Sequence, residues 1–520
     1  MSVSLRQSMA WIHGWLGLLA GWLLFAMFLT GTASYFRPEI TRWMQPESRI
    51  PAVSTERAAA TAIAYLQRTG ADDLQWYVFL PDARRPTTEI FPVPKPDAAK
   101  AASRPDEIEL DPATGQPVTA RETRGGEQFY RFHFQLQLPH PWGRWLAGLC
   151  AMFMLGAILS GVITHKRIFA DFFTLRWNKG QRSWLDAHNV SAVLALPYHA
   201  MITYTGLITL VTMYMPWPIL ANYKQPAEFA QVAFSQPADR AATGKRVGLT
   251  PIAPLIADAG HRLGAPVSRI IIHHPNDQAA TITLAQGTGT TINARGPSVT
   301  YDGATGRWLE QSGTGSTALA TAGVMLGLHL AQYAGPALRW AYFAMGLTGV
   351  AMVGTGLLLW TAKRRRPGAA PFFGLRLVER LNIAVIVGLP IGMASYLLAN
   401  RLIPAMQPGR ADAEVATMFW AWGLVALVQL VRPARRAWRE GFALAALVFA
   451  AIPLADAVTT TRGLPGSLLG GDTLFAAFDV AMLAIAALFA FAAWRTGRVP
   501  APRRRRAAPS APSLSETLHA

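Results

Sequence analysis

The strongest constraint on the fold of this 520-residue chain is a series of apolar runs long enough to cross a lipid bilayer. A transmembrane helix needs about 20 mostly apolar residues. Hydrophobic residues make up 51% of the chain, and its mean hydropathy is +0.22. The sequence therefore predicts a mainly helical, multi-pass membrane protein with eight spans. These are expected at about 10–36, 144–164, 186–214, 340–362, 378–402, 415–432, 442–460 and 473–494.

Lys and Arg gather in the short loops after the second, fourth, sixth and eighth predicted spans. Short loops rich in these residues stay on the cytoplasmic side. We therefore expect both chain ends in the cytoplasm and the long hydrophilic segments 37–139 and 215–320 on the outer side. The clusters are Lys166, Arg167, Arg176, Lys179 and Arg182, then Lys363, Arg364, Arg365 and Arg366, then Arg432, Arg435, Arg436 and Arg439, and finally Arg503, Arg504, Arg505 and Arg506.

The formal net charge of +18 comes largely from these clusters. Because they flank spans and do not build one basic face, the charge indicates membrane topology and no nucleic-acid partner. Cys150 is the single cysteine, so the chain has no intrachain disulfide, no thiolate cluster and no motif for covalent haem attachment. Any bound metal cofactor must therefore be held by histidines.

The first four predicted spans form an internal repeat. The run HGWLGLLAGWLLFAMFLTG from His13 aligns with HNVSAVLALPYHAMITYTG from His188, and the second span aligns with the fourth. A hydroxyl residue followed by glycine recurs at matching positions in each alignment. The matched dipeptides are Thr30-Gly31 with Thr205-Gly206, and Ser160-Gly161 with Thr355-Gly356.

The repeat predicts how histidines of the two copies meet. Two parallel copies related by an axis along the membrane normal would bring His13 opposite His188. The same axis would bring His133, in FHF, opposite His329, in LHL. His188 and His199 are 11 residues apart, so on one straight helix they would share a face at roughly 16 Å along the axis.

The two long hydrophilic segments repeat as well. Each begins with a helix-like run, TERAAATAIAYLQRTG or LTPIAPLIADAGHRLG, and continues with strand-like runs. Each also contains a hairpin pattern, ELDPATGQPV or TYDGATGRWLE, whose Asp and Gly are typical turn residues. The sequence therefore predicts two small α+β domains, each inserted between two spans, followed by four further spans.

Histidines concentrate in the repeated half, although a polar side chain inside hydrocarbon is costly and usually has a partner or a function. Haem b suits a site between apolar helices because it needs axial imidazoles whose second nitrogens are hydrogen-bonded. Zinc prefers three or four convergent ligands, and a proton relay needs ionisable groups in series. The histidines in or beside the first four spans are His13, His133, His140, His165, His188, His199 and His329.

Over residues 1–365 the chain resembles the PepSY-associated transmembrane-helix proteins of bacterial inner membranes. The resemblance rests on WIHGWLGLLAGWLLFAMFLTG, GVITHKRIFADFFTLRWNKGQRSWLDAHN, DAHNVSAVLALPYHAMITYTGL and the two α+β segments, which look like PepSY modules. It implies two PepSY-like periplasmic domains inserted in an internally repeated four-helix core that binds haem b, with two haem groups expected. The axial candidates that it implies are His13, His133, His165, His188, His199 and His329.

The resemblance implies the function of a ferrisiderophore reductase. Such a protein passes electrons from a cytoplasmic donor, which would be a reductase, a flavin or a quinol, to a ferric siderophore in the periplasm. Two alternatives remain open: an iron or siderophore permease without redox activity, which Asp456 and Asp479 would permit, and a PepSY-type regulator of a periplasmic peptidase. The expected divisions are the first span 1–36, a domain 37–139, two spans 140–214, a domain 215–320, the fourth span with its His segment 321–365, four further spans 366–498, and a disordered basic tail 499–520.

Overall fold

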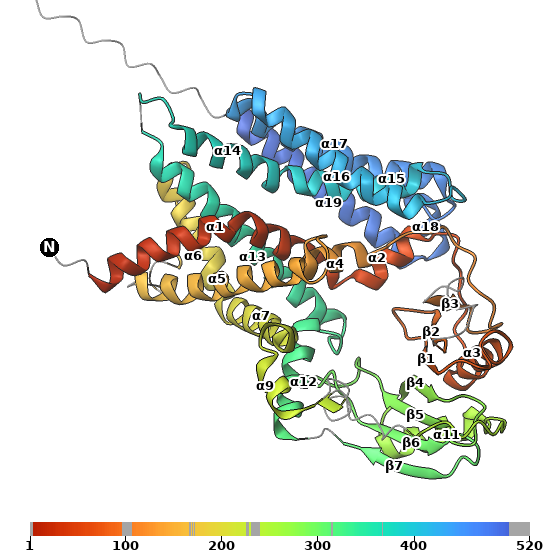
Figure 1. Cartoon of the computed structure of the whole chain (residues 1–520). Coiled ribbons are helices and arrows are strands. Elements are labelled where there is room, and N and C mark those ends of the chain that lie inside the picture. The colour runs from red at the N-terminus through yellow and green to blue at the C-terminus, as the bar shows by residue number, and fades with distance from the viewer. Residues whose placement is uncertain are drawn as a thin grey trace, which may run out of the picture.

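A computed structural model describes residues 4–95, 107–165, 168, 170, 172–224, 228–229, 240–313, 316–366 and 368–498. Long helices form the larger part, and a β-sheet domain is attached at one end of them (Figure 1). This end is called the sheet side below. The basic tail expected at 499–520 lies outside the described residues.

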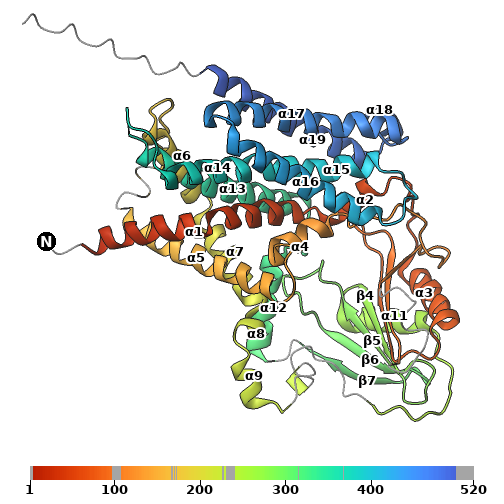
Figure 2. The ribbon, with the colours of Figure 1, turned by 45° about the horizontal axis from the view of Figure 1, so that its top comes forward.

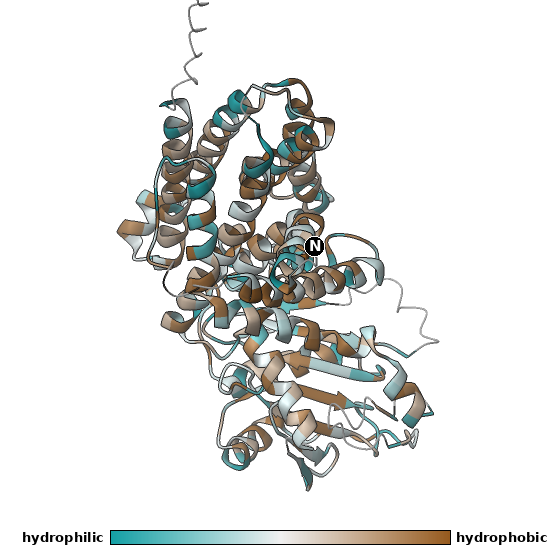
Figure 3. Ribbon diagram, turned by 90° about the vertical axis from the view of Figure 1, so that its left-hand side faces the viewer, coloured by the Kyte–Doolittle hydropathy of each residue, from teal (hydrophilic) through white to brown (hydrophobic). Residues whose placement is uncertain are grey.

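Within the described residues, seven helices are long and apolar enough to cross a membrane, and one bent helix pair raises the number to eight if it counts as one span. This confirms the expected multi-pass helical protein, and Figure 3 shows how hydrophobic residues dominate these helices. The spans are α1 (Leu5–Ser34), α5 (Trp142–Thr164), the pair α6 (Gln181–Leu194) and α7 (Leu196–Thr209), α13 (Pro336–Arg364), α14 (Phe373–Ile386) with α15 (Gly388–Leu402), α16 (Arg410–Val431), α17 (Ala434–Thr459) and α19 (Thr473–Arg498).

The third span is not one straight helix, so the expectation that His188 and His199 share a face is wrong. The axes of α6 and α7 differ by 68°. Ala195 leaves helical geometry between them, with φ −121° and ψ 29°, and Pro197 stands at the start of α7. Proline lacks an N–H and its ring collides with the carbonyl four residues earlier, so a helix cannot continue straight through it. His188 therefore belongs to α6 and His199 to α7.

The two hydrophilic segments build a single antiparallel sheet in the order β3-β2-β1-β4-β5-β6-β7. They join where β1 pairs with β4, with Tyr77 opposite Ile271. The sequence did not predict this joining, because two copies of one module could equally pair within themselves. The strands are β1 (Gln75–Phe79), β2 (Thr88–Val93), β3 (Ile108–Leu110), β4 (Val267–His273), β5 (Thr281–Gln286), β6 (Ser298–Asp302) and β7 (Trp308–Ser312).

The internal repeat is visible within the sheet domain. A helix precedes each set of strands, α3 (Thr55–Thr69) in the first segment and α11 (Ile252–Leu263) in the second. Both expected turns place glycine at positive φ, +68° at Gly115 and +73° at Gly306. The N–H of Gly115 donates to the carbonyl of Asp111 (2.7 Å), and that of Gly306 to Asp302 (2.9 Å). The Asp and Gly of the two hairpin patterns thus play the same role in the two turns.

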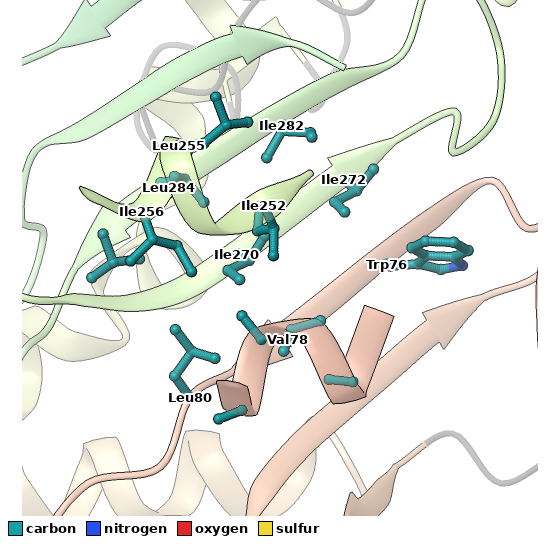
Figure 4. Packing of buried hydrophobic residues seen from close by; sticks show 14 of the residues in the cluster. Trp76, Val78, Leu80, Ile252, Leu255, Ile256, Ile270, Ile272, Ile282 and Leu284 are labelled. Atoms are coloured by element: carbon teal, nitrogen blue, oxygen red, sulfur yellow. The ribbon is translucent and has the colours of Figure 1, made fainter. Parts of the chain in front are cut away.

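Apolar side chains from both segments share one core beneath α3 and α11. Alternate residues of the central strands, such as Val78, Ile270 and Leu284, point to the face that these helices cover (Figure 4). Successive strand residues point to opposite faces, so alternation buries one apolar face. The shared core makes the two segments one folding unit.

Shorter helices surround the junction between the spans and the sheet. They are α2 (Arg37–Met44), α4 (Glu127–Gln135), α8 (Val211–Tyr214), α9 (Trp217–Asn222), α12 (Thr317–Leu330) and α18 (Leu464–Gly470). The helices from α14 onward lie together as a layer along the first four spans (Figures 1 and 2). This layer, α14 to α19, is called the C-terminal bundle below.

Candidate functional site

Two histidines face each other at the end of the first spans that lies far from the sheet. The ring centroids of His13, on α1, and His188, on α6, are 6.0 Å apart and the rings are inclined by 64°. Nδ1–H of His13 donates to the carbonyl of Ala157, and that of His188 to the carbonyl of Met352, both at 2.8 Å. A carbonyl only accepts, so Nδ1 carries the proton and each Nε2 keeps its lone pair. These residues are called the distal pair.

A second pair stands at the sheet side. The rings of His133, on α4, and His329, on α12, are also 6.0 Å apart, with an interplanar angle of 30°. Nδ1–H of His133 donates to the carbonyl of Met27 (2.7 Å), and that of His329 to the carbonyl of Ile202 (3.1 Å). The Thr205 hydroxyl lies 3.2 Å from the same His329 nitrogen. These residues are called the sheet-side pair.

The pairing expected from the internal repeat is confirmed, because each pair joins one histidine from each copy. Both pairs use the same local arrangement, in which Nδ1 is bound to the backbone of a neighbouring helix. Neutral imidazole held by its other nitrogen is the form in which histidine ligates a metal.

Four glycines make room for the four paired rings. A β-carbon at any of them would come closer to an imidazole than real β-carbons normally do. They are the glycines of the repeated dipeptides. The sequence repeat identified these positions, and the structure shows why each is glycine. The distances from that β-carbon are 2.6 Å for Gly31 to His133, 3.1 Å for Gly161 to His13, 2.8 Å for Gly206 to His329, and 3.1 Å for Gly356 to His188.

The spacing of both pairs fits one metal ion between two imidazoles. Bonds of about 2 Å from a transition metal to each Nε2, plus roughly 1 Å from nitrogen to ring centre, separate two such centroids by about 6 Å. Among the described residues, no group of three or more His, Cys, Asp or Glu side chains could hold a metal ion together. Each pair therefore offers two nitrogen ligands, which is the axial set of haem b and fewer than structural zinc takes.

His199 lies between the two pairs and faces neither of them. Its Nε2–H donates to the Thr348 hydroxyl (3.2 Å), which itself donates to the Met345 carbonyl (2.6 Å). Its ring is 6.0 Å from that of Phe28, and its buried Nδ1 has no hydrogen-bond partner. His133 and His329, which the resemblance also implies as axial candidates, pair with each other and not with His199.

His165, the remaining candidate, follows the end of α5. Its Nε2 bonds to the Asn189 side chain at 3.0 Å, one residue beyond His188. The resemblance implies His13, His165 and His188 alike as axial candidates. The structure brings His13 and His188 together. His165 is instead hydrogen-bonded to the side-chain amide of Asn189, which is next to His188 in the sequence.

A cavity of about 950 Å³ opens from the sheet-side pair toward the sheet. At its membrane end it is lined by the paired histidines with Gly31 and Gly206. At the other end it reaches the beginning of β4 and the loop between β1 and β2, which contribute Arg269 and Arg84. Sequence analysis missed these lining residues, because nothing in the local pattern shows that the β1–β2 loop and β4 face the membrane helices.

Burial keeps the sheet-side pair neutral. Desolvation lowers the pKa of His133 below its ordinary value of 6.5. Desolvation, and then the charge of His133, lower the pKa of His329 to about 3. Charged imidazole is disfavoured where water cannot solvate it. Both rings are therefore in the ligating form at neutral pH.

The fold and the two half-buried histidine pairs define a class: a helical membrane protein with a repeated four-helix core, paired histidines at both ends of that core, and a sheet domain at one end. The chain belongs to the family described as the PepSY-associated TM region, whose model matches residues 10–363. An uncharacterized protein of Pseudomonas aeruginosa, PA4219, is 28% identical over 313 residues, which cover 55% of this chain and 76% of the relative.

Proposed function

We propose that this protein binds two haem b groups, one at each histidine pair, and carries electrons across a bacterial inner membrane. The observation that carries the proposal is that two histidine pairs with the same 6.0 Å ring separation stand at opposite ends of one helical core. When bound, haem b supplies reversible one-electron oxidation and reduction.

The chain prepares both sites in the same way. Backbone carbonyls of neighbouring helices hold the four Nδ1–H groups, which fixes the tautomer and leaves the lone pair of each Nε2 free for a metal. Glycines opposite the rings keep the space that a side chain would fill.

The two pairs stand far enough apart to serve the two membrane faces. His13 and Met27, whose carbonyl binds His133, are 14 residues apart on α1, or about 21 Å at 1.5 Å per residue. His199 contacts Phe28 and Thr348 in this part of the core. A helical core with a site near each end suits electron movement without a mobile carrier.

The proposed acceptor is ferric iron chelated by a siderophore in the periplasm. The cavity beside the sheet-side pair gives a chelate a place next to that pair, and the positive-inside pattern assigns the sheet side to the periplasm. Addition of one electron converts Fe(III) to Fe(II), which hard oxygen ligands of a siderophore hold much more weakly, so iron is released. The electron would come from a cytoplasmic reductase, flavin or quinol at the distal pair.

Haem analysis of the purified full chain tests the proposal. Pyridine-haemochrome assay of protein made with adequate haem supply should give about two b-type haems per chain. After dithionite reduction, addition of a ferric siderophore should reoxidise the Soret spectrum and yield Fe(II), trapped by a ferrous chelator. Protein that folds and contains no haem would refute the proposal and leave the permease and the peptidase regulator as the remaining hypotheses.

A further inference from the structure

The C-terminal bundle contains a buried cluster of charges that the proposed electron transfer does not use. Asp456 on α17, Asp479 on α19 and Trp43 on α2 are fully buried, and Arg401 on α15 is 3% exposed. Arg401 forms an ion pair with Asp456. Its guanidinium also lies 3.7 Å from the centre of the Trp43 ring and donates to the Trp43 carbonyl (2.5 Å). The indole N–H of Trp43 donates to Asp479 Oδ1 at 3.3 Å.

The charges of this cluster do not balance if both aspartates are ionised. Arg401 supplies one positive charge against two carboxylates. The neighbouring buried cations have their own partners: Arg410 pairs with Glu414 (2.8 Å) and Arg121 with Glu47 (2.6 Å). One uncompensated negative charge would remain inside an apolar bundle, where burial of an unpaired charge costs several kcal/mol or more.

The hydrogen bonds have a matching deficit. Asp456 Oδ2 and Asp479 Oδ2 are both buried and neither has a donor. The helices that carry the two aspartates, α17 and α19, pack against each other, and both carboxyl groups contact the same Arg401–Trp43 unit. Two carboxylates repel, whereas a carboxylic acid donates to a carboxylate. A single proton between them therefore removes the excess charge and supplies the missing donor.

We infer that Asp456 and Asp479 share one proton and form a proton-binding site in the C-terminal bundle. Asp479 is the residue that carries the proton, because Asp456 faces Arg401 while Asp479 receives only a neutral indole N–H. A metal cation fits poorly, because the Arg401 guanidinium already occupies the cation position at Asp456.

The site joins the C-terminal bundle to the remainder of the protein. Arg401, Asp456 and Asp479 come from three helices of the bundle, and all three are linked to one another or to Trp43 of α2. α2 directly follows the first span and leads into the sheet domain. Loss of the proton would leave repelling carboxylates at this joint, so the attachment of the bundle depends on pH. This inference does not rest on haem binding.

Infrared spectroscopy of the full chain tests the site directly. The unmodified protein should show the C=O stretch of a protonated carboxylic acid near neutral pH, and carbon-13 labelling of aspartate should shift it. Asp479→Asn and Asp456→Asn should each abolish this band, because the single carboxylate left in the cluster then balances the one positive charge of Arg401 and ionises. Asp412→Asn is the matched control, because Asp412 is exposed and pairs with Arg124; it should keep the band.

Thermal unfolding gives an independent readout. The melting temperature of the unmodified protein and of Asp412→Asn should fall as the pH rises from about 6 to about 9, because the folded state binds a proton that the unfolded state has lost. In Asp479→Asn the amide imitates the neutral acid and donates from Nδ2, so this pH dependence should largely disappear. A labelled wild-type spectrum without the acid band would overturn the inference, even if neither variant folded. So would a band kept in both variants, or a pH dependence replaced by dependence on Na⁺.

Discussion

The two histidine pairs have the same ring separation and the same Nδ1 arrangement, but they stand on different kinds of element. The distal pair comes from α1 and α6, which belong to membrane spans. The sheet-side pair comes from α4 and α12, short helices outside the candidate spans, and lines a large cavity. One pair thus lies among the spans, while the other lies beside the sheet domain and its cavity. The difference shows that one repeated ligand arrangement can stand both within the spans and next to a cavity in a single chain.

Removal of one ligand from either pair should have the largest effect. We expect His188→Leu and His329→Leu each to lower the haem content from about two to about one per chain, because an aliphatic side chain cannot ligate iron. Reduction of ferric siderophore by dithionite-treated protein should be lost in His329→Leu, which empties the pair beside the cavity. His140→Leu, outside both pairs, is the control. Loss of both haems from each single variant would indicate misfolding and break the comparison.

Substitution of the glycines beside the rings should weaken haem binding at the two pairs to different degrees, with a smaller effect than the loss of a histidine. A β-carbon on Gly31 would lie 2.6 Å from His133 Nδ1, whereas one on Gly356 would lie 3.1 Å from the His188 ring. Overpacking costs about 1–3 kcal/mol, so Gly31→Ala should weaken haem binding at the sheet-side pair by about tenfold or more. Gly356→Ala should weaken the distal site less. Haem titration monitored at the Soret band measures both, and equal losses would contradict the steric explanation.

The contrast between the two pairs also shows what could be predicted from sequence. Apolar runs fixed the spans, and the repeat predicted both histidine pairings, because hydropathy and symmetry are properties of the chain itself. The position of His199 could not be obtained in this way. Its apparent alignment with His188 required a straight helix, and the bend at Ala195 and Pro197 redirects α7. The cavity and the joined sheet depend on contacts between distant segments, for which the sequence carries no local signal.

His199 offers a test of whether a third histidine shares in either pair. Its Nε2–H already bonds to Thr348, and glutamine can keep such a donor. We expect His199→Gln to retain about two haems per chain and a nearly unchanged Soret spectrum. Because His199 lies between the pairs, the substitution should instead slow electron exchange between them. Stopped-flow measurement of reoxidation tests this. Loss of one haem would show that His199 is an axial ligand and that one of the two proposed histidine pairs does not bind haem.

The smallest expected effect is the response of the sheet-side pair to acid. An imidazole with the ordinary pKa of 6.5 would lose its ligating form as the pH falls, and haem affinity would drop about tenfold per pH unit below that value. Burial lowers the pKa of His133, and burial with the charge of His133 lowers that of His329 to about 3. Haem titration of the His188→Leu variant, in which this pair alone binds, should therefore show an affinity that begins to fall only below the pH at which an ordinary imidazole site would weaken. The global stability of the haem-free chain should behave differently. Below about pH 6.5 the histidines of the unfolded chain bind protons that the folded histidines do not bind, so the free energy of unfolding decreases as the pH decreases. An affinity that follows the ordinary titration of imidazole would show that water reaches this pair through the cavity.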